Sequence, residues 1–293
     1  KMSYDNSELL RAYCTAYAAF GDPHWRDVAA GIVAWVLEVL ADRARGAFFT
    51  SQDADVGPED DGDYWTWTLA EARTALTPAQ LDAAARVFDI DDVGEMHHDP
   101  AKNVLWWKHD PAEDERPVLE AAIGRLKAAR DRRAAPYVDA TAYVSWNAMM
   151  AGAFLQAGAV LDRPECNALA LQVLERIWAE SWDAAAGMSH VLGGGEPRGL
   201  LDDNAQSAAA FLDAYEATGN DAWRERAVAV MTYCATAHWA PHWDDPAGGY
   251  FDLAQGQNGT AYLATRAKPV QDAPTPSPNG VAALVLARLW ALS

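Results

Sequence analysis

The 293-residue chain has little of several features that mark common protein classes. No apolar run approaches the roughly 20 residues that a helix needs to cross a bilayer. The first residues, Lys1 to Asp5, form neither a signal peptide nor a transit peptide. Basic residues are scarce, because 23 Lys and Arg stand against 42 Asp and Glu, which gives a net charge of −19. A chain this acidic repels nucleic acid and anionic membrane surfaces, so we expect neither as a partner.

The three cysteines, Cys14, Cys166 and Cys234, are far apart and form no Cys-X-X-Cys pair. This spacing argues against a disulfide framework, a zinc ribbon and a thioredoxin-type redox centre within the chain, and it indicates a reducing, cytoplasmic location. No P-loop, Gly-X-Gly-X-X-Gly or Gly-X-Ser-X-Gly motif is present, and His97-His98 matches no zinc spacing. We therefore expect no cofactor and no metal.

Tryptophan, in contrast, is abundant: the chain has 13, together with 10 tyrosines and 7 phenylalanines. The indole N–H needs a hydrogen-bond partner, which makes Trp a demanding core residue, whereas its flat ring makes a good platform for a sugar ring. The composition therefore favours a carbohydrate ligand.

An internal repeat organises the chain. Helical stretches of about 14 residues begin near four asparagines, and in three of them a turn follows 15 residues later, at Gly21, Asp162 and Gly219. A second helix follows each turn, and each pair ends at a glycine and a short strand-like segment, such as Gly187-Met188-Ser189-His190. The repeat predicts helical hairpins whose first helices begin near Asn6, Asn147, Asn204 and Asn279.

The two helices of each hairpin differ in polarity. The first helices are apolar or small on nearly all sides, so we expect Phe154, Leu155, Leu284 and Leu286 to be buried. The second helices carry charge on one face. Buried inner helices that alternate with amphipathic outer helices are typical of an all-α, (α/α)6-type toroid, here with short β-hairpins in the loops.

We predict a single α/α-barrel domain over residues 1–293, in which segment 56–140 is an aberrant hairpin with long insertions. The chain begins on an inner helix and ends within another, where the next turn would follow. This pattern predicts a toroid that is incomplete at its ends and cut from a longer protein, or else a ring closed by pairing of the first and last helices.

Inner helices of such a ring run parallel, so their N-termini share one face, where unpaired N–H groups and helix dipoles favour anions and hydroxyls. We expect a funnel there that contains the catalytic acids Asp203, Asp53 and Asp139, because paired carboxylates supply acid–base chemistry for sugars. Burial and neighbouring carboxylates should raise the pKa of at least one of these acids. Capping is the simplest explanation of the asparagines, and loop hydrogen bonding is the alternative for Asp53 and Asp55. The predicted substrate-binding residues are Asp5, Asn6, Asp55, Trp65, Trp146, Asn147, Asp202, Asn204, Asp272, Ser277 and Asn279.

Six motifs occur in order along the chain: Lys1-Met2-Ser3-Tyr4-Asp5-Asn6, Asp53-Ala54-Asp55, Tyr64-Trp65-Thr66-Trp67-Thr68, Ser145-Trp146-Asn147, Leu201-Asp202-Asp203-Asn204-Ala205 and Asp272-Ala273-Pro274-Thr275-Pro276-Ser277-Pro278-Asn279. Through these motifs nearly the whole chain resembles the helical-barrel part of the spermatogenesis-associated, thioredoxin-like protein family. The resemblance implies a six-hairpin-glycosidase type barrel related to N-acylglucosamine 2-epimerases. It also implies a thioredoxin-like domain that precedes the barrel in the full protein and is absent from this chain.

One motif departs from the family. Where its members usually carry Asp-Asp-Lys before Trp-Asn, this chain has Asp139-Ala140-Thr141, so a lysine is missing from the expected funnel floor. An epimerase-like mechanism also needs paired histidines at inner-helix ends, and none of the seven histidines lies at an asparagine-marked helix start.

Two functions stay open at this point. The first is a carbohydrate-active barrel, epimerase- or glycosidase-like, in which Trp65 and Trp146 stack on the sugar and Asn147 and Asn279 bind its hydroxyls. The second is a non-catalytic module that interacts with its own thioredoxin-like domain or with another protein, which the missing lysine favours.

Overall fold

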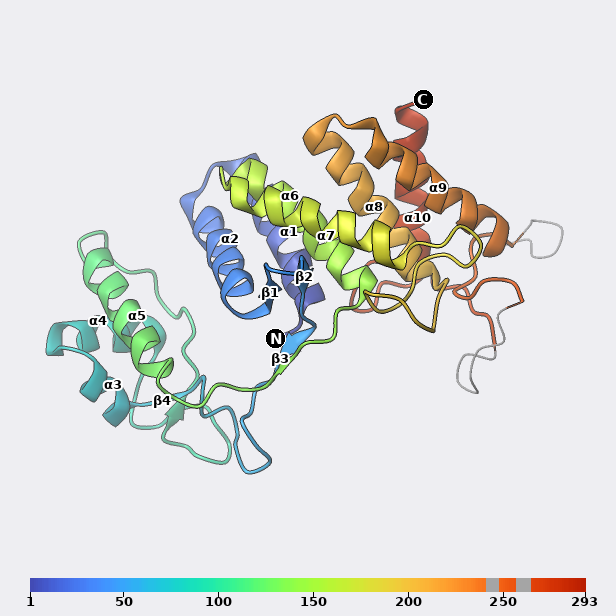
Figure 1. Cartoon of the computed structure of the whole chain (residues 1–293). Coiled ribbons are helices and arrows are strands. Elements are labelled where there is room, and N and C mark those ends of the chain that lie inside the picture. The colour runs from blue at the N-terminus through green and yellow to red at the C-terminus, as the bar shows by residue number, and fades with distance from the viewer. Residues whose placement is uncertain (241–247, 257–264) are drawn as a thin grey trace. The chain divides into compact units, whose positions relative to one another are not determined.

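The computed structural model describes residues 1–240, 248–256 and 265–293 (Figure 1). Contacts divide the chain into two compact units, one of residues 1–51 and 138–293 and the other of residues 52–137. The second, smaller unit overlaps segment 56–140, which is expected to interrupt the repeat.

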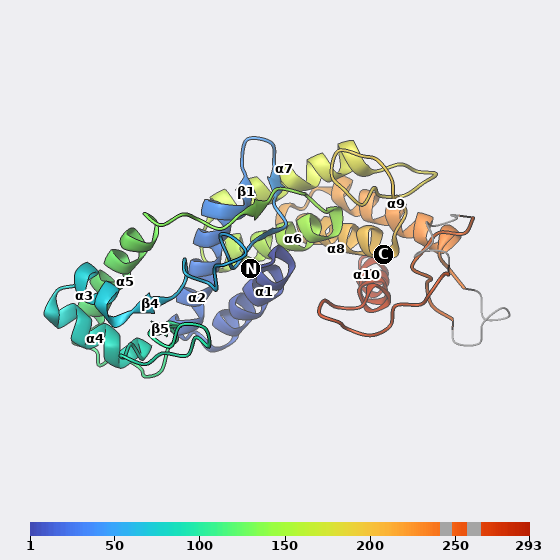
Figure 2. The same cartoon turned by 90° about the horizontal axis from the view of Figure 1, so that it is seen from below.

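The larger unit consists of helical hairpins, each an inner helix followed by an outer one. The inner helices α1, α6, α8 and α10 are neighbours in this order, and α2, α7 and α9 pack on the outer side of the first three (Figure 1, Figure 2). The inner helices are α1 Ser3–Phe20, α6 Val144–Val160, α8 Leu201–Thr218 and α10 Pro278–Ala291. The outer helices are α2 Pro23–Trp35, continued by the π-helical turn η1 Val36–Leu40, α7 Pro164–Ser181 and α9 Asp221–Ala237.

The helix ends follow from the turn residues of the repeat. Gly21 and Gly219 adopt the left-handed conformation, with φ of 69° and 67°, and their N–H groups bond to carbonyls of the preceding turn, which ends α1 and α8. The side chains of Asp22 and Asn220 then accept an N–H of the first turn of the next helix. The 15-residue spacing between asparagine and turn therefore sets the length of these inner helices.

Contacts at both ends show that the inner helices run parallel. At the N-terminal ends, the Ser145 N–H of α6 donates to Asp203 of α8 at 3.0 Å. Farther along the helices, Asp213 of α8 pairs with Arg11, at the middle of α1, and with Arg288 of α10. The first turns of the four inner helices therefore lie on one side of the unit, as the repeat predicts, and we call this side the N-terminal face.

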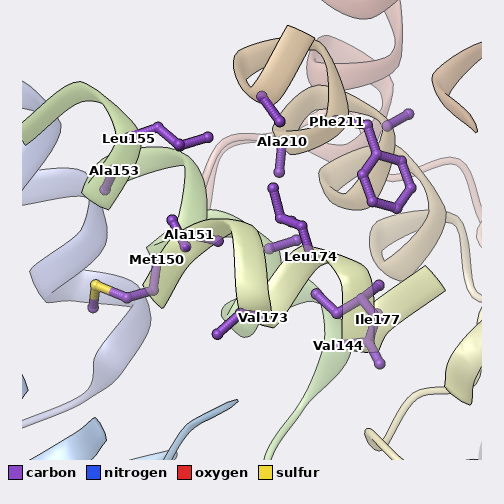
Figure 3. Packing of buried hydrophobic residues seen from close by; sticks show 14 of the residues in the cluster. Val144, Met150, Ala151, Ala153, Leu155, Val173, Leu174, Ile177, Ala210 and Phe211 are labelled. Atoms are coloured by element: carbon purple, nitrogen blue, oxygen red, sulfur yellow. The ribbon is translucent and has the colours of Figure 1, made fainter. Parts of the chain in front are cut away.

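The core of the larger unit forms around α6. Phe154 and Leu155 of this helix are buried, as predicted. Leu174 and Ile177 of α7 and Phe211 of α8 pack in the same cluster (Figure 3). Because large side chains from several helices meet here, removing one leaves a cavity that its neighbours fill only in part.

The prediction that α10 is equally buried is wrong. Its Leu284 and Leu286 side chains are 58% and 42% exposed. The helix packs on α8 and α9 and buries Val281, Ala282 and Val285, whereas in the described part of the chain its opposite face is uncovered. An apolar sequence shows that a helix can be surrounded, but it does not show which neighbours surround it.

The smaller unit has a hydrophobic core of its own, formed by β4, α3, α4 and α5. Thr77 and Gln80 form a capping box at the start of α4, and Pro78 occupies the first helical position. The elements of this unit are β4 Trp67–Thr68, α3 Leu69–Ala75, α4 Pro78–Phe88, β5 Lys102–Asn103 and α5 Arg116–Arg130, and β4 pairs antiparallel with β5.

Short strands occur in the loops, as expected. β1 Ala41–Asp42 forms an antiparallel hairpin with β2 Ala47–Phe48, and β3 Ser51–Gln52 pairs with β6 Val138–Asp139. Among the described residues, no helix combines the length and the apolar character that crossing a membrane requires.

Leu155→Ala should lower the free energy of unfolding by about 2–5 kcal/mol, because it opens a cavity beside α6. Leu284→Ala removes the same atoms from a side chain that is more than half exposed, so its cost should stay below about 1 kcal/mol. Urea denaturation of both variants measures the difference. Equal losses for the two would contradict the description of α6 as the buried helix and α10 as the exposed one.

Candidate functional site

Three short backbone segments hold the N-terminal face together. Each follows a glycine with positive φ after an outer helix or its π-helical extension, at Gly46, Gly187 and Gly249. Each contacts two successive inner helices. Its third residue bonds to the start of one inner helix, and its first residue bonds to an asparagine of the next inner helix. We call them bridging segments, and they are residues 48–50, 188–190 and 250–252.

The third residue of each bridging segment supplies a cap for an inner helix. The carbonyl oxygens of Thr50, His190 and Asp252 accept the first backbone N–H of α1, α6 and α8 respectively, each at 2.9 Å. The first N–H groups of a helix have no acceptor within the helix itself. The bridging segment therefore provides the hydrogen bond that the helix start requires.

The first residue of each bridging segment is held by an asparagine of the next inner helix. Asn147 Oδ1 accepts the Phe48 N–H at 2.6 Å, and its Nδ2 donates to the Phe48 carbonyl at 3.0 Å. Asn279 holds Tyr250 in the same way, at 2.8 and 2.9 Å. Asn204 accepts the N–H of the first residue of its segment at 3.1 Å. Each asparagine thus links its helix to the preceding hairpin.

The interpretation of these asparagines as N-caps is therefore wrong. Asn147 and Asn204 lie four positions after the N-cap and are buried. Asn6 donates to a backbone carbonyl of its own helix start. The amide groups are engaged in the fold, and the N-cap positions belong to Met2, Tyr143, Leu200 and Ser277.

The second bridging segment places a histidine beside a buried carboxylate. His190 Nδ1 lies 2.9 Å from Asp203 Oδ2, and Asp203 Oδ1 accepts the Ser145 N–H at 3.0 Å. Asp203 is fully buried, whereas the His190 side chain is 33% exposed. Asp203 thus joins the starts of α6 and α8 and orients an imidazole that solvent reaches.

Both members of this pair hold their proton to higher pH than usual. The hydrogen bond to Asp203 raises the pKa of His190 above its ordinary value, because the carboxylate stabilises the imidazolium. Burial raises the pKa of Asp203, and the hydrogen bond from His190 opposes this effect.

Asp202 is a second acid at the same place. Burial and the neighbouring Asp203 raise its pKa to about 6. The side chains of Ser145 and Gln206 lie beside its carboxylate and partly offset this rise. Among the predicted acids, the expected rise of a pKa is found at Asp202 and Asp203. We call Ser145, His190, Asp202, Asp203 and Gln206 the polar cluster.

Aromatic rings continue the N-terminal face from the polar cluster. The Tyr143 ring lies 4.8 Å from the His190 imidazole and 5.0 Å from Trp146, which in turn lies 4.7 Å from Tyr4. All of these side chains are partly exposed. Exposed aromatic faces beside polar groups suit a ligand that is apolar on one side and polar at its edge.

The other predicted residues of the larger unit take part in local structure. Asp139 Oδ1 accepts the N–H and the hydroxyl of Thr141, and these bonds lower the pKa of Asp139. Asp272 accepts the Ser277 N–H at 2.8 Å, and Ser277 caps α10. Asp5 is exposed in the first turn of α1.

Asp53, Asp55 and Trp65 belong to the smaller unit. Asp53 and Asp55 are exposed and line a cavity of about 340 Å³ with Tyr137. Asp55 accepts a backbone N–H within its own loop, at 2.9 Å, in agreement with the alternative of loop hydrogen bonding. The Trp65 ring lies 5.3 Å from the Arg130 guanidinium.

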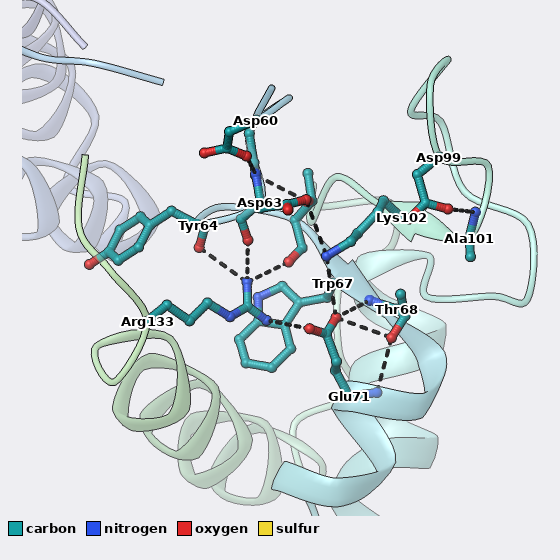
Figure 4. A network of polar contacts seen from close by, with 12 residues as sticks. Asp60, Asp63, Tyr64, Trp67, Thr68, Glu71, Asp99, Ala101, Lys102 and Arg133 are labelled. Carbon is teal, nitrogen blue, oxygen red and sulfur yellow. Dashed lines mark hydrogen bonds and ion pairs between the residues drawn. The ribbon is translucent and has the colours of Figure 1, made fainter. Parts of the chain in front are cut away.

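A second cavity of the smaller unit, of about 610 Å³, is bordered by a network of charges (Figure 4). Arg133 donates to backbone carbonyls in segment 63–66 and lies over the Trp67 ring at 4.2 Å. Lys102 lies 3.3 Å from Asp63 and 3.8 Å from Glu71. These charges are paired within the fold and stabilise the segment before β4.

In the ranges that the structure describes, no three His, Cys, Asp or Glu side chains are grouped for a metal ion.

His190 and Gln206 are not among the site residues predicted from the sequence. No histidine lies at the start of an inner helix in the sequence, but one does in the folded chain. His190, 13 residues before Asp203, contacts this aspartate in the first turn of α8. The repeat contained the signal: His190 stands in the same place as Thr50 and Asp252, at the third position of a bridging segment.

No protein-family profile matches the chain. Spermatogenesis-associated protein 20 from Homo sapiens is 29% identical over 331 residues, which cover 99% of this chain and 41% of the human protein. The chain is homologous to spermatogenesis-associated protein 20. It spans about two fifths of the length of that protein, and the thioredoxin-like domain expected before the barrel stays a prediction.

Among solved structures, a polysaccharide lyase matches 99% of this chain and 62% of its own, with a TM-score of 0.51 and 12% identity. A cellobiose 2-epimerase from Bacillus thermoamylovorans matches 99% of this chain and 72% of its own, with a TM-score of 0.42 and 11% identity. The likeness to the lyase shows the fold of this homologue of spermatogenesis-associated protein 20, and the helical-hairpin toroid is confirmed.

Asn147→Asp distinguishes the bridging role from a cap. Aspartate caps a helix as well as asparagine does, so a capping residue would tolerate the change. In the structure the new oxygen would instead face the carbonyls of Phe48 and Tyr143 in a buried site. We expect a loss of about 2–4 kcal/mol in the free energy of unfolding, measured by urea denaturation. Asn6→Asp, at the equivalent but partly exposed position, is the control and should cost less than about 1 kcal/mol. Equal tolerance of both changes would refute the bridging role.

Asp202→Asn should change stability in a pH-dependent way. Because the pKa of Asp202 is raised from 3.8 to about 6, its protonated form stabilises the fold at low pH, and this contribution is lost as pH rises through 6. The variant should therefore be more stable than the parent chain by about 1–3 kcal/mol at pH 8, but not at pH 4. Glu225→Gln, on the exposed side of α9, is the charge-matched control. A gain of the same size at both pH values would contradict the assignment.

Proposed function

We propose that this homologue of spermatogenesis-associated protein 20 binds and transforms a carbohydrate at the N-terminal face of its larger unit. The reaction would be an acid–base reaction of the epimerase or glycosidase type. The observation that carries the proposal is the 2.9 Å contact between His190 Nδ1 and Asp203, in a cluster that also contains Asp202.

His190 and Asp203 would act as an oriented base. A carboxylate next to Nδ1 favours the tautomer in which Nδ1 carries the proton, so Nε2 accepts a proton from the substrate. Asp203 then stabilises the imidazolium that forms. The partial exposure of His190 supports this role, because a ligand can reach the ring.

Asp202 would act as the acid. With a pKa of about 6, a fraction of its carboxyl groups still holds a proton near neutral pH, while a normal aspartate holds almost none. Because the pKa of His190 is raised above 6.5 and that of Asp202 lies near 6, both groups can exchange protons near neutral pH, as acid–base catalysis requires. Tyr143, Trp146 and Tyr4 would stack on the apolar face of the sugar.

Two further observations support the proposal. The solved structure that shares the fold is named a polysaccharide lyase, so a protein of this architecture acts on a sugar polymer. The thiols of Cys14, Cys166 and Cys234 are buried and unpaired, which supports a reducing, cytoplasmic location for the reaction.

Asp203→Asn tests the proposal. The variant keeps an oxygen for the Ser145 N–H but turns an amide N–H toward His190, which reverses the tautomer. A thermal-shift screen with mono- and disaccharides identifies a ligand, and NMR of the sugar follows its conversion. We expect kcat/KM to fall about 10²–10⁴-fold, with the unfolding midpoint nearly unchanged. Glu225→Gln should keep full activity. Conversion by Asp203→Asn at the parental rate would contradict the proposal.

The second candidate is a non-catalytic module that docks on a thioredoxin-like domain or on another protein. The exposed apolar side chains Leu284, Leu286 and Trp290 of α10 favour it. The same screen separates the two functions, because a docking module predicts no sugar-dependent thermal shift and no effect of Asp203→Asn on any sugar.

A further inference from the structure

The polar cluster also carries information on the kind of sugar that it accepts. Three of its buried atoms have no hydrogen bond of normal geometry, namely Oδ1 of Asp202, Oγ of Ser145 and Nε2 of Gln206, although the Ser145 and Gln206 side chains interact with the Asp202 carboxylate and lower its pKa. Ser145 and Gln206 are 1% and 7% exposed, and both side chains lie beside the Asp202 carboxylate. Donors and acceptors with unused hydrogen-bonding capacity therefore meet at one point, where α6 and α8 begin.

The chemistry of these atoms matches hydroxyl groups. Asp202 Oδ1 accepts a hydrogen bond, Gln206 Nε2 donates one, and the Ser145 hydroxyl does both. Buried polar atoms are unfavourable without partners, so a ligand that supplies them binds well. Neighbouring hydroxyls of a sugar ring both donate and accept, and thus satisfy all three atoms together.

The charge of the cluster disfavours an anionic ligand. Asp202 and Asp203 set two carboxylates against one imidazole, that of His190, which acts on both. The positive N-terminal end of the α8 dipole attracts anions, but the two aspartates in the first turn of α8 already compensate it. Arg198, opposite Ser189 of the bridging segment, donates to backbone carbonyls.

We infer that the site selects an uncharged sugar with adjacent hydroxyl groups and rejects uronic acids and sugar phosphates, and that Ser145, Asp202 and Gln206 bind the hydroxyls. This inference rests on the proposed function, because it concerns the same site. A carboxylate or phosphate on the ligand would add negative charge to a cluster in which two acids face one imidazole.

Binding of matched sugars tests the selection. Isothermal titration at pH 8 compares glucose, galactose and mannose with their uronic acids and 6-phosphates. We expect a neutral sugar to bind at least tenfold more tightly than its anionic counterparts. An anionic sugar that binds as tightly as its neutral counterpart overturns the inference and leaves sugar binding in place. If no neutral or anionic sugar binds, the proposed function fails together with the inference.

Two variants locate the selection in the cluster. Asp202→Asn removes one negative charge and should reduce the preference for the neutral sugar at least threefold at pH 8. Gln206→Met should weaken binding of the neutral sugar about tenfold with little loss of stability, because Gln206 Nε2 has no hydrogen bond of normal geometry in the fold. Gln156→Met, in the C-terminal half of α6, is the control and should keep the affinity. An unchanged preference in Asp202→Asn, or an unchanged affinity in Gln206→Met, overturns the assignment.

Discussion

Each inner helix of the larger unit shares a backbone segment with its neighbour, and the rest of the structure depends on this arrangement. The carbonyl of Thr50, His190 or Asp252 caps one helix, while an asparagine of the next helix holds the backbone two residues earlier. Because both contacts act on one short segment, they align the N-termini of successive inner helices at the same level along their axes. The N-terminal face and the polar cluster on it follow from that common level.

The opposite half of the larger unit is held by charge. Asp213 of α8 accepts hydrogen bonds from Arg11 of α1 and Arg288 of α10. The contact between Arg11 and Asp213 passes α6 at Gly152, where a Cβ atom would lie 1.9 Å from the guanidinium and 2.4 Å from the carboxylate. A residue with no side chain at this position thus lets two helices on either side of α6 form an ion pair. Backbone bridges at the N-terminal ends and this ion pair farther along the helices keep the inner helices parallel.

Much of this organisation could be predicted from the sequence, because it depends on local signals. The spacing from asparagine to turn gives the length of the inner helices, and helix polarity separates α6 from the outer helices. The neighbours of a residue are not local. Leu284 is apolar yet exposed because its neighbours cover one side of α10, and Asn147 resembles a cap although it bonds to a strand 99 residues earlier. His190 was missed for the same reason, since only the fold brings it to Asp203.

The central claim is that a bridging segment delivers His190 to a buried carboxylate that orients it. NMR of the ¹⁵N-labelled imidazole tests this most directly, because the nitrogen shifts report both the tautomer and the pKa. The account predicts a proton on Nδ1 in the neutral ring, a pKa above the ordinary 6.5, and a lower pKa in Asp203→Asn. A proton on Nε2, or a pKa that Asp203→Asn leaves unchanged, would contradict it.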